Sequence, residues 1–134
     1  MATRDWKSSV ATAFKRLHKP GEPVVVINIW DASSATAAAS VPGVKALATA
    51  SFAVAATYGV KDNDLTYEQN LAAVVPISRV ARQHALPLTV DFQDGYLDDI
   101  GKAITELIRL GVVGANIEDL NDRTGQLRSK EESV

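Results

Sequence analysis

Four apolar segments constrain what this chain can fold into more than any other feature of its sequence. They cover residues 24–30, 44–50, 86–90 and 112–117. None of them alternates strictly between apolar and polar side chains, and valine and isoleucine dominate the first. Continuous apolar strands are typical of parallel sheets, because helices cover such sheets. The segments therefore predict four strands of one parallel sheet.

Helical patterns fill the stretches between these segments. Apolar residues recur at spacings of three and four in residues 4–18 and 98–110, and residues 33–40 are rich in alanine. A longer helix is expected over residues 66–84, where Thr66 can cap the first turn. Strands that alternate with helices in this way indicate β/α units joined by right-handed crossovers.

Two stretches are less regular. Pro76 lies inside the longest helical pattern and is expected to kink or divide that helix. Residues 120–134 are polar and predict a loop that opens into an undeveloped helix. No linker interrupts the pattern, so the chain is predicted to form one α/β domain over residues 1–134.

Charge and composition exclude several classes of function. The chain has 14 basic and 16 acidic residues, so its net charge of -2 provides no positive field for nucleic acid or an anionic membrane. It has no cysteine, and no apolar run approaches the roughly 18 residues that a membrane span needs. We expect a cytoplasmic protein that acts on a small molecule, with no nucleic acid or membrane partner.

Acidic residues stand directly after three of the four predicted strands. Asp31, Asp91 and Glu118 take these places, whereas the second strand ends in Ser51 and Asp62 follows in the next loop. The carboxyl ends of parallel strands meet at one edge, where these carboxylates would repel one another unless a cation neutralised them. Magnesium, which takes oxygen ligands, is the cation expected. Each acid can also cap the following helix, so both interpretations stay open.

Five short motifs resemble a known family in their order and spacing. They are residues 28–32 (NIWDA), 49–51 (TAS), 59–62 (GVKD), 90–96 (VDFQDGY) and 114–119 (GANIED). They resemble motifs of the phosphoenolpyruvate mutase/isocitrate lyase superfamily, whose members include phosphonomutases, dimethylmalate lyases and oxaloacetate hydrolases. The resemblance runs from about residue 14 to residue 132. It implies about half of a TIM (β/α)8 barrel, since a whole barrel needs roughly 250 residues.

The resemblance also implies roles for individual residues. Asp91, Gln93 and Glu118 match the metal shell, Asp31 and Asp62 match catalytic positions, and Trp30, Ser51, Phe52 and Tyr96 match substrate-binding positions. In the family, Mg²⁺ at the barrel mouth binds the substrate's oxygens and stabilises an enolate. The implied activity is a magnesium-dependent lyase or phosphonomutase-type reaction on a small α-oxo or 2-hydroxy carboxylate.

Three departures from the family pattern narrow this expectation. Gln93 stands where many members have an acid, so a lower magnesium affinity is expected. Lyase chemistry that uses a cysteine as proton donor is not expected, because this sequence contains no cysteine. Half a barrel would also expose two sheet edges and the apolar inner faces of its strands, which favours a homo-oligomer. The alternative is a catalytically inactive, truncated half barrel that serves as an interaction protein or a degenerate paralogue.

Overall fold

The computed structural model describes residues 2–96, 100–121 and 124–131. Its helices are α1 (Ala2–Leu17), α2 (Ala32–Ala39), α3 (Ser51–Thr57), the 3-10 helix η1 (Asp62–Asp64), α4 (Tyr67–Gln83) and α5 (Ile100–Leu110). Its strands are β1 (Ile27–Ile29), β2 (Leu47–Thr49), β3 (Leu88–Asp91), β4 (Gly114–Asn116), β5 (Leu120–Asn121) and β6 (Gln126–Leu127). The four predicted strands are all present, each shorter than the apolar segment that predicted it. The predicted start of the last helix, at residue 98, lies outside the described residues.

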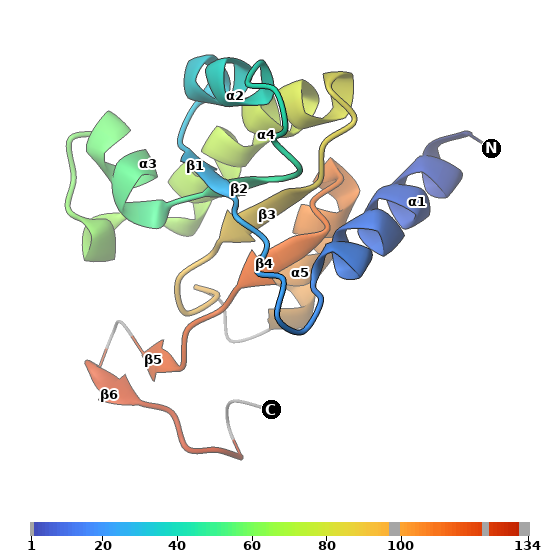
Figure 1. Cartoon of the computed structure of the whole chain (residues 1–134). Helices are drawn as coiled ribbons and strands as arrows, with labels where there is room; N and C mark the ends of the chain where they lie inside the picture. Colours follow the sequence, from blue (N-terminus) through green and yellow to red (C-terminus); the bar gives the residue numbers. More distant parts are fainter. Residues whose placement is uncertain (1, 97–99, 122–123, 132–134) are drawn as a thin grey trace.

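The main sheet has four parallel strands in the order β1-β2-β3-β4 (Figure 1). Each strand therefore pairs with the next one along the chain, and the register places Asp91 of β3 beside Asn116 of β4. Sequential parallel strands with intervening helices have the winding of a (β/α)8 barrel. The predicted α/β class and parallel sheet are confirmed.

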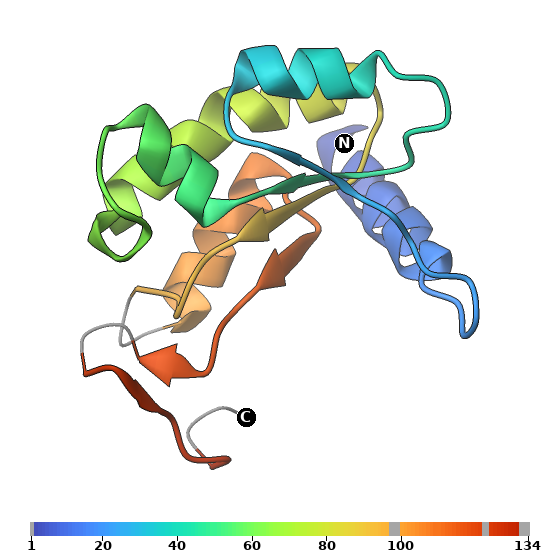
Figure 2. The same cartoon turned by 60° about the vertical axis from the view of Figure 1, so that its left-hand side comes forward.

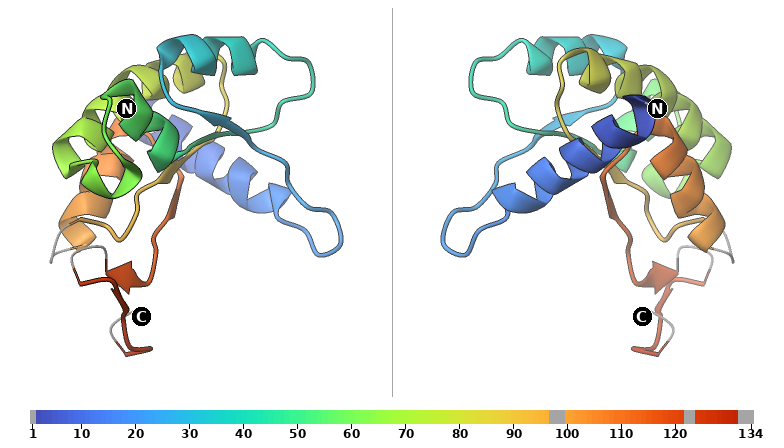
Figure 3. Two further views of the ribbon diagram at one scale, coloured as in Figure 1. Left: turned by 90° about the vertical axis from the view of Figure 1, so that its left-hand side faces the viewer. Right: turned by 90° about the vertical axis from the view of Figure 1, so that its right-hand side faces the viewer.

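Helices α2 and α4 lie together on one face of the sheet, and α1 crosses on the other side (Figures 2 and 3). The hydrophobic core lies between the sheet and helices α2, α4 and α5. Leu88 and Val90 of β3 belong to the same buried cluster as Val74 and Ile77 of α4. Burial of these side chains is the main stabilising contribution expected for this layer.

The inner face of the sheet, opposite the core, carries small and polar side chains. Thr89 and Asp91 alternate with the core residues of β3, and Asn28 and Asn116 occupy the edge strands. With Phe14 of α1 they line a cavity of about 340 Å³. The expectation of an apolar inner face is therefore wrong, because the strands turn their larger apolar side chains toward the helices.

Helix α1 packs against β4 and hydrogen-bonds to the end of α5. The Lys7 ammonium donates to the carbonyl oxygens of Ile108 and Arg109, at 2.8 and 2.7 Å, and so satisfies acceptors that the end of α5 leaves free. The Phe14 ring lies 2.8 Å from the place that a Cβ atom on Gly114 would occupy. Glycine at this position lets α1 approach the inner face of β4.

Local sequence signals set the start of α4. Thr66 is the N-cap: its hydroxyl accepts from the Gln69 N–H, and the Gln69 side chain accepts from the Thr66 N–H. This capping box confirms the predicted start of the helix. Pro76 lies within α4 and does not divide it, because it removes only one backbone donor while residues on both sides stay packed in the core.

Two further elements differ from the sequence-based expectation. The segment predicted to open into a helix forms the antiparallel hairpin of β5 and β6, because Gly125, with a φ of +67°, donates its N–H to the Asn121 carbonyl and closes a turn. The short helix α3 was not predicted, since its alanine-rich sequence has no side-chain cap at Ala50. In the described part of the chain, no helix has the length and apolarity needed to cross a membrane.

Candidate active site at the carboxyl ends of the strands

The Asp91 carboxylate joins the ends of β2 and β3. Asp91 Oδ2 accepts a hydrogen bond of 2.9 Å from the backbone N–H of Ser51, the first residue of α3. The backbone N–H of Asp91 donates to Thr49 Oγ1, also at 2.9 Å. These two bonds fix the Asp91 side chain next to Ser51, which the family pattern assigns to the substrate.

Gln93 brings Asp62 to the same edge of the sheet. Gln93 is only 4% exposed, and its side-chain amide donates to the backbone oxygen of Asp62 at 2.8 Å and to Asp62 Oδ1 at 2.9 Å. The φ of Gln93 is +45°, which non-glycine residues seldom adopt, so its contacts must hold this backbone in place. The amide nitrogen donates to Asp62, and the amide oxygen is the atom of Gln93 that can bind a hard cation.

Glu118 follows β4 and lies beside the loop after β3. Its backbone N–H donates to the carbonyl oxygen of Gln93 at 2.7 Å, and the residue is exposed. Asp91 and Glu118 thus lie at the ends of adjacent paired strands, as the sequence predicts.

Two carboxylates on adjacent strand ends fit magnesium in number and in chemistry. Mg²⁺ in proteins keeps several waters and takes one or two carboxylates. One lone-pair position of the Asp91 carboxylate accepts the Ser51 N–H, and an ionised carboxylate has several such positions. Within the described residues, no three acidic, histidine or cysteine side chains gather into a metal-binding group.

Asn70 connects the end of β3 to α4. This residue was not anticipated from the sequence. It is fully buried, and its side-chain amide donates to the backbone oxygen of Asp91 at 3.1 Å and to the Tyr96 hydroxyl at 2.9 Å. Asn70 lies on the buried stripe of α4, one and two helical turns before Val74 and Ile77. A polar residue on an otherwise apolar stripe is the signal that could have identified it.

Tyr96 packs behind the strand end in a small aromatic cluster. The centroid of its ring lies 5.1 Å from the ring centroid of Phe92 and 6.1 Å from that of Tyr67, and both contacts are edge-to-face. Burial raises the pKa of Tyr67, and the nearby Glu106 and Glu68 carboxylates add to this rise. Tyr96, assigned by the family pattern to the substrate, thus has its ring against other aromatic rings and its hydroxyl on Asn70.

Asp31 is the N-cap of α2. Its Oδ1 accepts from the Ser34 N–H at 2.7 Å and from the Ser34 hydroxyl at 2.8 Å. These bonds, the backbone one foremost, lower the pKa of Asp31. The structure shows the capping role, and a catalytic role for Asp31 stays a prediction. Trp30 beside it and Phe52 in the first turn of α3 are exposed, at 41% and 64%.

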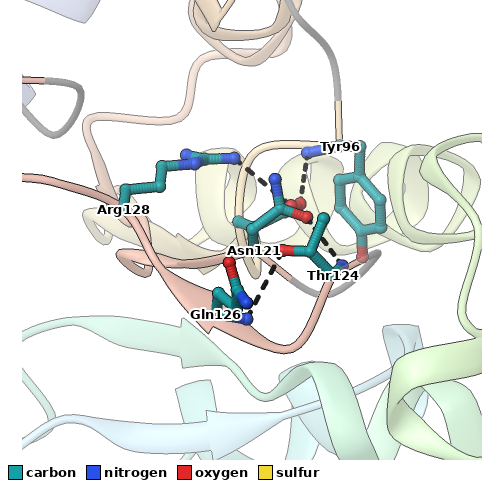
Figure 4. Close-up of polar contacts among 6 residues, drawn as sticks. Tyr96, Asn121, Thr124, Gln126 and Arg128 are labelled. Carbon is teal, nitrogen blue, oxygen red and sulfur yellow. Dashed lines mark hydrogen bonds and ion pairs between the residues drawn. The ribbon is translucent and has the colours of Figure 1, made fainter.

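An ion pair attaches the segment after β6 to the loop after β3. Asp94 Oδ2 lies 3.3 Å from the Arg128 guanidinium, and Asp94 Oδ1 accepts from the Tyr96 N–H at 2.9 Å. Figure 4 shows Arg128 and Tyr96 reaching this point from opposite sides. The Asp94 side chain is only 5% exposed, so the pair holds the hairpin segment directly against the loop.

The family model described as phosphoenolpyruvate phosphomutase matches residues 14–134, and the chain therefore belongs to that family. Uncharacterized proteins from two Mycobacterium tuberculosis strains, H37Rv and CDC 1551, are each 31% identical to the chain over 107 residues. The aligned residues make up 80% of this chain and 40% of each relative. The chain thus spans less than half the length of these curated relatives.

Solved structures of superfamily members resemble nearly the whole chain. A candidate phosphonomutase from Burkholderia cenocepacia J2315 is 36% identical, with a TM-score of 0.84 over 93% of this chain and 51% of its own. A candidate lyase/mutase from the same organism is 28% identical, with a TM-score of 0.82 over 96% and 47%. A 2,3-dimethylmalate lyase of the PEP mutase/isocitrate lyase superfamily is 26% identical, with a TM-score of 0.79 over 92% and 43%. The chain thus has the fold of about half of a TIM-barrel lyase, which confirms the prediction.

Proposed function

We propose that this chain carries the magnesium-binding half of an active site for a lyase or phosphonomutase-type reaction on a small α-oxo or 2-hydroxy carboxylate. The observation that supports this most directly is the Asp91 carboxylate, held on the Ser51 N–H where β2 and β3 end. Family membership supports lyase or mutase chemistry in general. The ion, the substrate class and the residue roles are the proposal.

Asp91 and Glu118 would hold Mg²⁺ from adjacent strand ends, with the amide oxygen of Gln93 facing the ion or one of its waters. The bound ion supplies fixed positive charge opposite the substrate oxygen that becomes negative as the bond breaks. Gln93 is a neutral ligand, so we expect weaker magnesium binding than a second acid in this loop would give.

Ser51 and Phe52 are the proposed binding residues for the substrate carboxylate. They open α3, and the first N–H groups of a helix have no acceptor within it. Because the Ser51 N–H already donates to Asp91, its hydroxyl and the Phe52 N–H are the groups assigned to the substrate. Trp30 and Tyr96 would form the walls of the site.

Asp62 and Asp31 are the acids proposed to act near the reacting bond. Asp62 is the stronger candidate, since Gln93 holds its carboxylate at the end of β3. Asp31 would have to combine this role with capping α2, and its bonds to Ser34 favour the charged form. A charged carboxylate is suited to accept a proton rather than to donate one.

Calorimetric titration with magnesium and oxalate, which mimics an enolate, tests the proposed function. We expect the chain to bind oxalate only with Mg²⁺ present, and Asp91→Asn to weaken that binding by about tenfold or more. Asp64→Asn is the matched control, because Asp64 is an exposed acid of η1 with no assigned role. A folded chain that shows no magnesium-dependent oxalate binding would contradict the proposal.

A second candidate is a catalytically inactive half barrel that binds another chain, including a second copy of itself. Two observations favour it. The Gln93 amide donates to Asp62 where many family members have an acid. The chain also spans only 47% and 51% of the two Burkholderia structures. Among the described residues, β4 is an edge strand beside a groove of about 390 Å³ between α1 and α5. Sedimentation equilibrium measures the mass in solution. A homo-oligomer that binds no oxalate supports this candidate, and a monomer that binds magnesium and oxalate rules it out.

A further inference from the structure

We infer that Asn70 is a positioning residue that fixes the direction of the Asp91 carboxylate from behind the sheet. The Asn70 amide donates to the backbone oxygen of Asp91 at 3.1 Å, on the side of the strand that faces α4. Holding the backbone of a residue restricts where its side chain can point. The inference rests on the proposed function, because it names what keeps the proposed metal ligand in place.

Asn70 occupies a place where an apolar side chain would normally stand. It is 0% exposed on the same stripe of α4 as Val74 and Ile77, and its Oδ1 has no partner among the described residues. A buried polar atom without a partner costs free energy, which a leucine of the same branching would avoid. The two hydrogen bonds that the Asn70 amide donates offset this cost.

Those two bonds bracket residues 92–95 of the loop after β3. One ends on Asp91, the last residue of the strand, and the other on the hydroxyl of Tyr96. Between them the chain passes through three residues of positive φ: Gln93 at +45°, Gly95 at +89° and Tyr96 itself at +60°. Such a backbone persists only where its surroundings over-determine it. Asn70 therefore also contributes to the shape of the loop that places Gln93.

The position of the Asp91 side chain can be followed without any ligand. The Ser51 N–H donates to Asp91 Oδ2 at 2.9 Å, and Ser51 is 3% exposed. Exchange of this N–H with solvent deuterium is slow while the carboxylate accepts it, and accelerates when that contact opens. Exchange at Ser51 thus reports the placement of Asp91 with no metal or substrate present.

Asn70→Leu tests the inference through two readouts. We expect the Ser51 N–H to exchange at least about tenfold faster, and the magnesium-dependent affinity for oxalate to fall about tenfold, while the circular dichroism spectrum is retained. Ser78→Ala is the matched control. Ser78 lies on the same helix, and its hydroxyl donates to the Val75 carbonyl within that helix at 2.8 Å, so neither readout should change.

A folded Asn70→Leu chain in which either readout stays at the wild-type value overturns the inference. If the wild-type chain itself binds no oxalate with magnesium, the proposed function fails, and Ser51 exchange alone decides whether Asn70 positions Asp91. If Asn70→Leu does not fold, Asn70→Ala takes its place, because it removes the amide that donates to the backbone oxygen of Asp91 and introduces no larger side chain. Faster exchange at Ser51 in Asn70→Ala supports the inference, and unchanged exchange overturns it.

Discussion

The loop after β3 and the hairpin after β4 lie at the same edge of the sheet, yet they are held in different ways. The β3 loop contains buried Phe92 and Gln93, and Asn70 of α4 donates a hydrogen bond to the backbone oxygen of Asp91, which directly precedes this loop. In the hairpin β5 is half-buried and β6 is exposed, with Leu127 at 70%, and an ion pair of Arg128 connects the hairpin to the loop. One side of the proposed site is therefore fixed by buried contacts from α4, and the other side is formed by a hairpin whose second strand is exposed.

Removal of a ring should separate the two regions most strongly. Phe92 is fully buried, and its ring centroid lies 5.8 Å from that of Tyr67. Phe92→Ala should therefore lower the free energy of unfolding by about 3–5 kcal/mol. Leu127→Ala in the hairpin should change it by less than about 0.5 kcal/mol. Urea denaturation measures both values. Similar losses at the two positions would remove the contrast.

A charge introduced into the buried loop should have the next largest effect. Gln93→Glu puts a carboxylate where an amide now donates to Asp62 Oδ1 at 2.9 Å, so stability should fall by about 1–3 kcal/mol. Added magnesium should restore part of that loss by neutralising the two acids. Thermal melting with and without magnesium measures the effect, and Gln126→Glu in the exposed hairpin is the control. A Gln93→Glu chain that melts independently of magnesium would argue against a metal at this loop.

The N-cap of α2 adds a smaller effect that depends on pH. Asp31→Ala should cost about 1 kcal/mol of stability at neutral pH. The bonds from Ser34 lower the pKa of Asp31 in the folded chain below its ordinary value of 3.8. The charged cap therefore contributes its full stabilisation above pH 3.8. This stabilisation is lost as the pH falls through the lower pKa of the folded chain. The gap between wild type and variant should therefore close in acid, as urea titrations would show. A difference in unfolding free energy between wild type and variant that does not change with pH would mean that the carboxylate charge is not the capping feature. Asp119→Ala, in the exposed segment before β5, serves as the control.

The smallest effect on stability is expected at the ion pair that ties down the hairpin. Arg128→Met removes the contact to Asp94 and should change the free energy of unfolding by less than about 1 kcal/mol, since Arg128 is partly exposed. Hydrogen exchange should nevertheless rise at Gly125, whose N–H closes the hairpin turn, and stay unchanged at Ser51. A parallel rise at both residues would show that the loop and the hairpin move as one unit.

The parts of the molecule that the sequence predicts are those whose determinants lie close together in the chain. The capping box joins Thr66 to Gln69 within a single helical turn, and it was recognisable. The acids directly after the strands were recognisable for the same reason. The polar inner face was missed although Asn28 stands between Ile27 and Ile29, because the apolar run around it concealed the alternation.

The contacts that complete the candidate site join residues that are far apart in sequence. Gln93 reaches Asp62 across 31 positions, and Asn70 reaches Asp91 across 21. Such pairs produce no periodic pattern, so neither the residue that holds Asp62 nor the one that holds Asp91 could be read from spacing. A buried asparagine on an apolar stripe gave the only trace of the second pair.

The order of the strands also has a consequence for how the chain folds. Each of β2, β3 and β4 pairs with the strand of the main sheet that was synthesised just before it, so each new β/α unit meets a partner surface that already exists. This arrangement keeps the loops that close on pairing shorter than a shuffled strand order would, which lowers their entropic cost and favours faster folding. Because synthesis proceeds from the amino terminus, the topology favours growth of the sheet from β1 toward β4, one unit at a time.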